Sequence, residues 1–409
     1  MLAIPPPTII SFRISSSSVA EYIWYNHTMQ TSDISYRNSV TYSIYVRNHT
    51  QEGTFRAVEP DLKRIRDLGT DMVWLMPVHP IGQKGKKGSL GCPYSISDYR
   101  DTNPCYGSID DFRHLVDAIH AHGMKCIIDV VYNHTSRDSV LLSQNPDFYW
   151  KNRDGKPGNR FEDWTDVYDL NYGNRELWEY QAETLKFWAS IVDGFRCDVA
   201  STVPVEFWKY AREEVEKVNP SCFWLGETVF SDMITGVRST GLDIWTDNQM
   251  YEAFDAEYQY DIFRLFQGLF DGRTSLETYL YALNSQEYIY PENYMKLRFV
   301  ENHDTERFAS LCPDFEKRMQ WLSFMFFQKG PMLIYAGQEF SCTTKPSLFD
   351  IDVFDRNGKD ISSEIAQLVT MKKSLPTDAV FQAKLTGRNT VEASYYSDNK
   401  TIVSREFAL

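Results

Sequence analysis

Short apolar runs alternate with amphipathic stretches from about residue 42 to about residue 376. Eight of these runs are rich in β-branched and aromatic residues, which predicts strands at 41–47, 71–77, 125–132, 193–199, 222–228, 252–258, 296–302 and 331–337. The runs show little strict alternation of apolar and polar positions. That pattern is typical of parallel strands that are covered on both faces.

The amphipathic stretches between the runs carry helix signals. In residues 108–123, Ser108 and Asp111 have the spacing of a capping box, and Gly123 stands where a helix C-cap is expected. Residues 175–190 repeat the pattern of one apolar face. Eight strands alternating with helices over about 330 residues predict an α/β fold, a (β/α)8 TIM barrel.

Composition divides the chain into further parts. Residues 41–134 and 173–376 make up the predicted catalytic barrel. Residues 135–172 are rich in Asp, Asn, Gly and aromatic residues and are too long for a simple connection. They predict a short insertion subdomain after strand 3, over the mouth of the barrel. Residues 377–409 alternate like strands and indicate a partial C-terminal β region. Residues 1–40 carry no clear pattern and are interpreted as an N-terminal extension, with disorder left open.

Charge and cysteine content exclude several classes of protein. A net charge of -14 leaves no basic surplus to neutralise phosphates, so no nucleic-acid partner is expected. No window offers the roughly 18 apolar residues of a membrane span. The 7 cysteines are scattered and form no C-x-x-C pair, which indicates reduced thiols. Residues 1–13 lack the features of a signal peptide, so a cytoplasmic location is favoured over secretion. The oligomeric state stays open.

The predicted strand 193–199 carries two charges that a buried strand should not contain. Arg196 and Asp198 lie two residues apart, hence on one face of the strand. Asp198 falls where the strand should end, which is where a barrel of this kind carries its catalytic groups. A guanidinium beside a carboxylate favours the ionised form and fixes its geometry, as a nucleophile requires. The alternative is a buried ion pair that only locks the strand, although such pairs rarely add net stability.

Two more acids follow other predicted strands. Glu227 comes after an aromatic run at 223–225, and a carboxyl group in such surroundings is expected to keep its proton, as a general acid must. Asp304 ends the run FVENHD at 299–304. A single acid at a strand end can be a helix N-cap. Three acids at three strand ends are better explained by one shared site.

Four short motifs resemble, in order and in position, the four sequence regions of the α-amylase family, glycoside hydrolase family 13. They are DVVYNH (129–134), GFRCDVAS (194–201), GETV (226–229) and FVENHD (299–304). The resemblance covers about residues 42–376 and is specific as a set, whereas each motif alone is weak. Residues 91–112 are also similar to the family's segment after the second strand.

The resemblance implies a role for each matching residue. Asp198 would be the nucleophile, Glu227 the general acid/base, and Asp304 the residue that stabilises the transition state. The implied substrate-binding residues are Tyr94, which would stack on a sugar ring, His134 and His303, which would hydrogen-bond the sugar, and Arg196, which would orient the nucleophile. The implied chemistry is retaining hydrolysis through a covalent glycosyl-enzyme, with the two carboxyl groups about 5–5.5 Å apart.

The implied substrates are starch-like glucans or maltooligosaccharides with α-1,4 links. One alternative is a transglycosylase, which would pass the same intermediate to another sugar. A second alternative is an inactive carbohydrate-binding scaffold, whose sequence mark would be the loss of one of the three acids. A metal-dependent barrel hydrolase would need His and Asp clusters at strand ends, which the Asn-His pairs do not provide.

The implied chemistry needs no cofactor, but the resemblance raises the question of a structural calcium ion. Family members often bind calcium between the barrel and the insertion, and Asn133 and Asp169 match two ligand positions. Against this, Ser201 and Thr202 stand where many α-amylases carry Lys and His, and the His position also lends a carbonyl to the ion. The sequence therefore leaves calcium binding and ordinary α-amylase specificity open.

Overall fold

The computed structural model describes residues 32–161 and 164–409. Most of the predicted N-terminal extension lies outside the described residues. The described part of it begins at residue 32, and the 3-10 helix η1 (Ile34–Asn38) leads directly into the first strand, which begins at Val40. Arg37 of this short helix is buried and donates hydrogen bonds to backbone carbonyls of Tyr294 and Thr377. Arg37 therefore links the start of the described chain to the segments before β9 and after α14.

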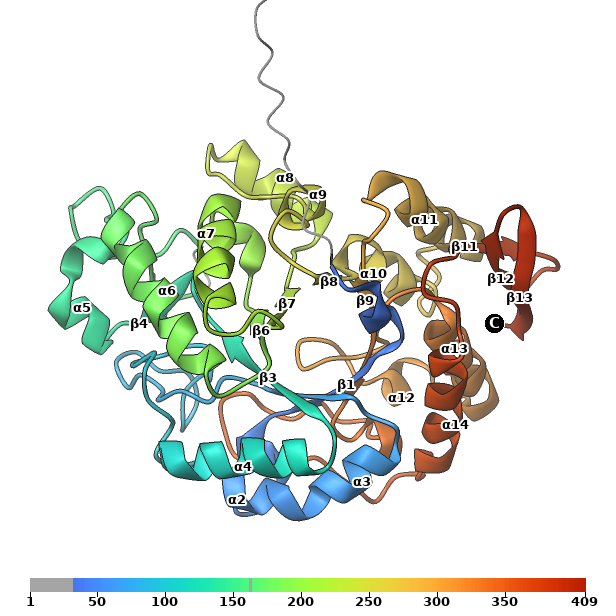
Figure 1. The fold of residues 1–409 in the computed structure, drawn as a ribbon, viewed down its shortest axis with the longest axis horizontal. Helices are drawn as coiled ribbons and strands as arrows, with labels where there is room; N and C mark the ends of the chain where they lie inside the picture. The colour runs from blue at the N-terminus through green and yellow to red at the C-terminus, as the bar shows by residue number, and fades with distance from the viewer. Residues whose placement is uncertain (1–31, 162–163) are drawn as a thin grey trace, which may run out of the picture.

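Eight parallel strands form one sheet in the order β10-β1-β2-β3-β6-β7-β8-β9. Their bounds are β1 (Val40–Ile44), β2 (Met72–Leu75), β3 (Lys125–Val130), β6 (Gly194–Cys197), β7 (Phe223–Gly226), β8 (Ala256–Tyr258), β9 (Lys296–Leu297) and β10 (Met332–Tyr335). Arg298, directly after β9, forms an isolated bridge with Met332 of β10, which closes the sheet. The predicted (β/α)8 barrel is confirmed, and each predicted run contains one strand (Figure 1).

Two of the predicted strands are shorter than their apolar runs. Only Lys296 and Leu297 of the run 296–302 are strand; Arg298 adds the isolated bridge to β10, and residues 299–302 are not paired in the sheet. In the run 252–258 only the last three residues pair, because a turn after the helix at 247–250 precedes them. The runs are buried throughout, and burial alone does not distinguish a strand from a packed loop.

Helices surround the strands (Figure 1). They are α1 (Val46–His49), α2 (Phe55–Val58), α3 (Leu62–Asp67), α4 (Ile109–Ala121), α6 (Arg175–Ala189), α7 (Val205–Glu216), α8 (Ser231–Ser239), α9 (Asp247–Met250), α10 (Tyr260–Gly268), α11 (Leu276–Ile289), α12 (Phe308–Leu311), α13 (Phe315–Phe327) and α14 (Ser362–Lys373). Short 3-10 helices occur at η2 (Glu59–Asp61), η4 (Ala200–Thr202) and η5 (Gln338–Phe340). The predicted capping box of α4 is confirmed, since Ser108 accepts from the Asp111 amide and Asp111 reaches back to Ser108.

The segment after β3 forms a small structure of its own beside the barrel mouth. It contains β4 (His134–Ser136), α5 (Val140–Gln144), η3 (Pro146–Phe148) and β5 (Val167–Asp169). Strands β4 and β5 pair in antiparallel fashion, with His134 opposite Asp169. The insertion therefore begins and ends at the carboxyl end of β3, so its residues border whatever lies at that end of the barrel.

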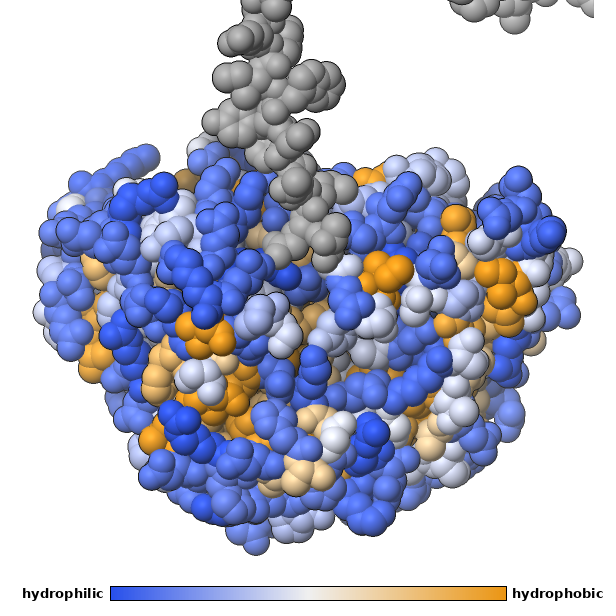
Figure 2. Space-filling view, in the orientation of Figure 1, coloured by the Kyte–Doolittle hydropathy of each residue, from blue (hydrophilic) through white to orange (hydrophobic). Residues whose placement is uncertain are grey.

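A three-stranded antiparallel sheet follows α14 at the C-terminal end of the described chain. It consists of β11 (Val380–Leu385), β12 (Thr390–Ser397) and β13 (Lys400–Ala408). The sheet lies beside α11 and α13 (Figure 1), and Tyr395 donates a hydrogen bond of 2.9 Å to the Phe327 carbonyl. Most of the surface seen in Figure 2 is hydrophilic, with small apolar areas between charged side chains. Among the described residues, no helix is both long and apolar enough to cross a membrane.

Candidate active site

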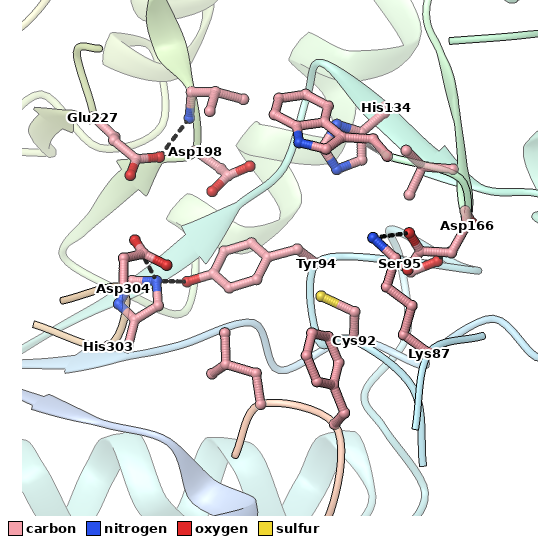
Figure 3. A pocket seen from close by; sticks show the side chains of 15 residues that line it. Lys87, Cys92, Tyr94, Ser95, His134, Asp166, Asp198, Glu227, His303 and Asp304 are labelled. Atoms are coloured by element: carbon pink, nitrogen blue, oxygen red, sulfur yellow. Dashed lines mark hydrogen bonds and ion pairs between the residues drawn. The ribbon is translucent and has the colours of Figure 1, made fainter. Parts of the chain in front are cut away.

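The three predicted acids border one cavity at the carboxyl end of the barrel strands. Asp198 follows β6, Glu227 follows β7, and Asp304 lies in the segment after β9. All three line a cavity of about 260 Å³, together with Tyr94, His134 and His303 (Figure 3). Residues that are up to two hundred positions apart converge here because parallel strands present their carboxyl ends at the same face of a barrel.

Arg196 is the centre of the charge network beneath the cavity. Its Nη1 lies 2.7 Å from Asp198 Oδ1 and 2.9 Å from Asp129 Oδ1. Its Nη2 lies 2.9 Å from Glu227 Oε2, as an ion pair without the alignment of a hydrogen bond. The guanidinium is fully buried, and Nε donates to the Tyr258 hydroxyl. One cation therefore holds the carboxyl groups of both Asp198 and Glu227 at the floor of the cavity.

A strained turn directly after Asp198 contacts Glu227. Val199 has φ 37° and ψ 44°, a left-handed conformation that is unfavourable for a β-branched residue. In this conformation its backbone N–H donates a 2.8 Å hydrogen bond to Glu227 Oε2. The Val199 carbonyl accepts a bond from Thr202 Oγ1, which holds the turn. Strain of this kind persists only where surrounding contacts enforce it, and it accumulates at functional sites.

The surroundings of Glu227 favour its protonated form. Burial raises the pKa of Glu227 well above the ordinary value of 4.5, and the charges of Asp198 and Asp304 add to the effect. Arg196 and the Val199 amide act in the opposite direction but do not cancel it. Asp198 Oδ1 accepts a hydrogen bond of 2.7 Å from Nη1 of the Arg196 guanidinium. A carboxyl group that keeps its proton in this way can serve as a general acid.

His303, Tyr94 and Asp304 form a second linked group. The Tyr94 hydroxyl lies 2.8 Å from His303 Nε2 and 3.1 Å from Asp129 Oδ2, and the two rings are stacked with centroids 5.5 Å apart. Nε2 of His303 also lies 3.2 Å from Asp304 Oδ2. Burial lowers the pKa of His303 to about 4, so its ring is neutral at neutral pH. Asp304 is the most open of the three acids, with a side chain 44% exposed.

His134 forms the wall of the cavity on the side of the insertion. Its ring packs against Trp164, with centroids 5.2 Å apart, and its Nδ1 lies 3.1 Å from Asn133 Nδ2. At the far end of the cavity, Lys87 forms an ion pair of 3.2 Å with Asp166 of the insertion (Figure 3). This pair joins the loop after β2 to the insertion, and it bounds the cavity opposite the three acids.

The residues predicted as calcium ligands do not fit a calcium site. Asn133 and Asp169 are adjacent, but the guanidinium of Arg160 donates to both, at 2.8 Å each. Calcium takes six to eight oxygen ligands. Within residues 32–161 and 164–409, no cluster of three or more His, Cys, Asp and Glu could hold a metal ion. Ser201 and Thr202, where the family often has other residues, are buried in η4 and do not line the cavity.

Sequence reasoning missed several residues of the site. Asp129 interrupts an apolar strand just as Arg196 does, so its charge was a usable signal. Burial raises the pKa of Asp129 above its usual range, while Arg196 opposes the shift. Trp164, Lys87 and Arg160 lie in loops, where no periodicity points to a function. Their roles become visible only from the contacts that they make.

A family model and the similar solved structures all indicate the alpha-amylase family. A family model described as the alpha amylase catalytic domain matches residues 35–379. The crystal structure of an alpha-amylase from Lactobacillus plantarum is 43% identical, with a TM-score of 0.87, over 89% of this chain and 87% of that one. A noncanonic maltogenic alpha-amylase from Thermotoga neapolitana is 31% identical, with a TM-score of 0.80, over 89% of this chain and 84% of that one.

A curated alpha-amylase from Haloarcula japonica is 26% identical over 357 residues, which are 84% of this chain and 50% of that protein. The chain spans about half the length of the curated relatives that it matches.

Proposed function

Because this chain belongs to the alpha-amylase catalytic-domain family, we propose that it is a retaining glycoside hydrolase that cleaves α-1,4-glucosidic bonds in starch-like glucans or maltooligosaccharides. The observation that carries the proposal is the guanidinium of Arg196, which contacts both Asp198 and Glu227 below one cavity. A retaining mechanism needs a nucleophile and a proton donor close together, in different protonation states. The shared contact with Arg196 and the raised pKa of Glu227 support this assignment of the two carboxyl groups.

The first half of the proposed reaction forms a covalent intermediate. Glu227 donates its proton to the glycosidic oxygen, and the leaving sugar departs with that proton. Asp198 attacks the anomeric carbon from the opposite face and forms a glycosyl ester. Arg196 donates a hydrogen bond to Asp198 Oδ1 and so orients the carboxyl group before the attack. The strained Val199 turn holds Glu227 beside it.

The second half returns the enzyme to its starting state. The Glu227 carboxylate takes a proton from a water molecule, whose oxygen attacks the anomeric carbon and releases Asp198. Two inversions at the same carbon leave the product with the configuration of the substrate. Four further side chains line the cavity: Tyr94, His134, His303 and Asp304. In the proposed reaction Tyr94 stacks on the sugar that carries that carbon, and the other three hydrogen-bond it. No step of this sequence requires a metal ion.

Product analysis tests the proposal. Amylose, pullulan and short maltooligosaccharides are incubated with the protein, and the products are identified by chromatography and by NMR of the fresh anomers. We expect cleavage of α-1,4 links with α-anomers formed first. Products with the β configuration, or an inert folded protein, would refute the proposal. Oligosaccharides longer than the substrate would instead identify a transglycosylase, in which a second sugar replaces water as the acceptor.

The raised pKa of Glu227 predicts an unusual pH dependence. A general acid works only while protonated, so a folded-state pKa above 4.5 extends activity to higher pH. We expect kcat/KM on maltooligosaccharides to persist well above pH 4.5 and to fall as the pH rises through the pKa of Glu227. Initial rates measured across a pH series show where kcat/KM falls. A fall centred near 4.5 would mean that burial does not hold the proton on Glu227.

The proposal includes a cytoplasmic location. All 7 cysteines are free thiols in the structure, and five of them are buried. Free thiols in this number suit a reducing compartment.

A further inference from the structure

Arg160 joins three separate parts of the chain next to the cavity. Its Nε and its backbone N–H both donate to Asp169 Oδ2, each at 2.8 Å. Its Nη2 donates to Asn133 Oδ1 at 2.8 Å. Asn133 and Asp169 are fully buried, and the side chain of Arg160 is only 17% exposed. The guanidinium therefore lies inside the seam between the barrel and the insertion.

At this seam the guanidinium of Arg160 occupies the two oxygens that the sequence predicted as metal ligands. The guanidinium stays protonated in proteins and presents a rigid fork of donors, so it satisfies a carboxylate and an amide oxygen at once. A divalent cation would have to displace it and collect further oxygen ligands. Asn133 Nδ2 donates a hydrogen bond of 3.3 Å to Oδ1, the other carboxylate oxygen of Asp169. Both oxygens of Asp169 thus accept hydrogen bonds from within the chain.

We propose that Arg160 is a built-in cation that takes the place of a structural metal ion and positions His134 for substrate binding. The insertion is then joined to the end of β3 without calcium. The second part of the proposal rests on the proposed function, since it assigns His134 to the sugar. The first part does not depend on it.

The positioning of His134 follows from donor chemistry. Arg160 can only donate, so the atom of the Asn133 amide that faces it must be the oxygen. The amide nitrogen then points toward His134 Nδ1, 3.1 Å away, and it can only donate as well. Nδ1 must therefore accept, which places the proton of a neutral His134 ring on Nε2. Arg160 thus selects the tautomer whose Nε2–H is free to donate to a sugar hydroxyl.

The metal question is tested on the unaltered protein. Calcium binding is measured by isothermal titration calorimetry, and Tm is measured with millimolar calcium chloride and with excess EDTA. We expect no calcium binding and the same Tm in both solutions. Stoichiometric calcium binding, or a Tm that rises with calcium and falls with EDTA, would overturn the replacement of the metal. These readouts do not depend on catalytic activity, so they hold whether or not the proposed function does.

The positioning role is tested with Arg160→Gln and Arg160→Lys. Arg153→Gln is the matched control, because Arg153 is an exposed arginine of the same insertion. We expect Arg160→Gln to lower kcat/KM by about 10- to 100-fold, the usual cost of losing a side chain that orients a ligand-binding residue. Arg160→Lys should recover part of that loss, because lysine keeps the charge but lacks the fork. The control should match the original protein.

Thermal unfolding separates positioning from support of the fold. Rates are measured well below the Tm of each variant, so that only folded protein contributes. A lower Tm with unchanged kcat/KM in Arg160→Gln would overturn the positioning of His134. A protein without glucan activity in its original form would refute the proposed function alone, while the calcium and Tm measurements still decide the replacement of the metal.

Discussion

Asp198→Asn is expected to lower glucan turnover by roughly 10⁴- to 10⁶-fold, the range seen when a nucleophile is removed. The amide has nearly the shape of the carboxylate but cannot form the glycosyl ester. Arg196 keeps its contacts with Asp129 and Glu227, so we expect the fold to persist with little change in Tm. Initial rates on maltooligosaccharides and a thermal unfolding curve measure the two effects.

Asp147→Asn is the matched control for this change. Asp147 lies on the insertion, its side chain is 80% exposed, and it pairs with Lys151 far from the three acids. The same chemical substitution there should leave turnover unaltered. Normal turnover in Asp198→Asn would remove Asp198 as the nucleophile. Loss of turnover together with unfolding would point instead to the buried ion pair as a support of the strand.

Glu227→Gln is expected to lower activity on natural glucans by about 10²- to 10⁴-fold, the usual contribution of general acid-base catalysis. Its effect should depend on the leaving group. A sugar alcohol needs protonation to depart, whereas a fluoride or a nitrophenolate leaves without it. We therefore expect the first step to survive on glycosyl fluorides or nitrophenyl glycosides. The second step, which needs a base, should slow, so that the covalent intermediate accumulates and mass spectrometry detects it.

Glu183→Gln is the control for Glu227. Glu183 is 62% exposed on α6 and contacts only Lys186 among the described charged groups near it. That variant should behave like the original protein on both kinds of substrate. If Glu227→Gln lost activity equally on natural glucans and on fluorides, Glu227 would not be the proton donor. A stable covalent adduct would also identify the residue that carries the sugar, which we expect to be Asp198.

Much of the candidate site could be predicted because barrel chemistry is tied to local sequence. A charged residue inside an apolar run, or directly after it, marks a strand end, and the ends of parallel strands meet. Asp198, Glu227 and Asp304 were found in this way, and the structure brings them to one cavity. The same reasoning could have found Asp129, which breaks its strand as clearly as Arg196 does.

The loops around the cavity could not be predicted in the same way. Lys87 and Asp166 are ordinary loop charges in the sequence, yet they form an ion pair of 3.2 Å at the far end of the cavity. Val199 gives no sign of its left-handed backbone, because the conformation is imposed by its hydrogen bonds to Glu227 and Thr202. Contacts of this kind depend on how distant segments pack, and neither propensity nor periodicity encodes them.

The sequence by itself determined the barrel and the acids at its strand ends, because the burial of side chains repeats along each element and the order of elements restricts the topology. Only the tertiary structure decided how the charges are shared. It brought Glu227, from the end of β7, and Asp129, from β3, to the same guanidinium of Arg196 that contacts Asp198. It also placed Arg160 on both predicted calcium ligands. Most of these partners are far apart in the sequence, so the distance between their polar groups is determined only when the chain folds.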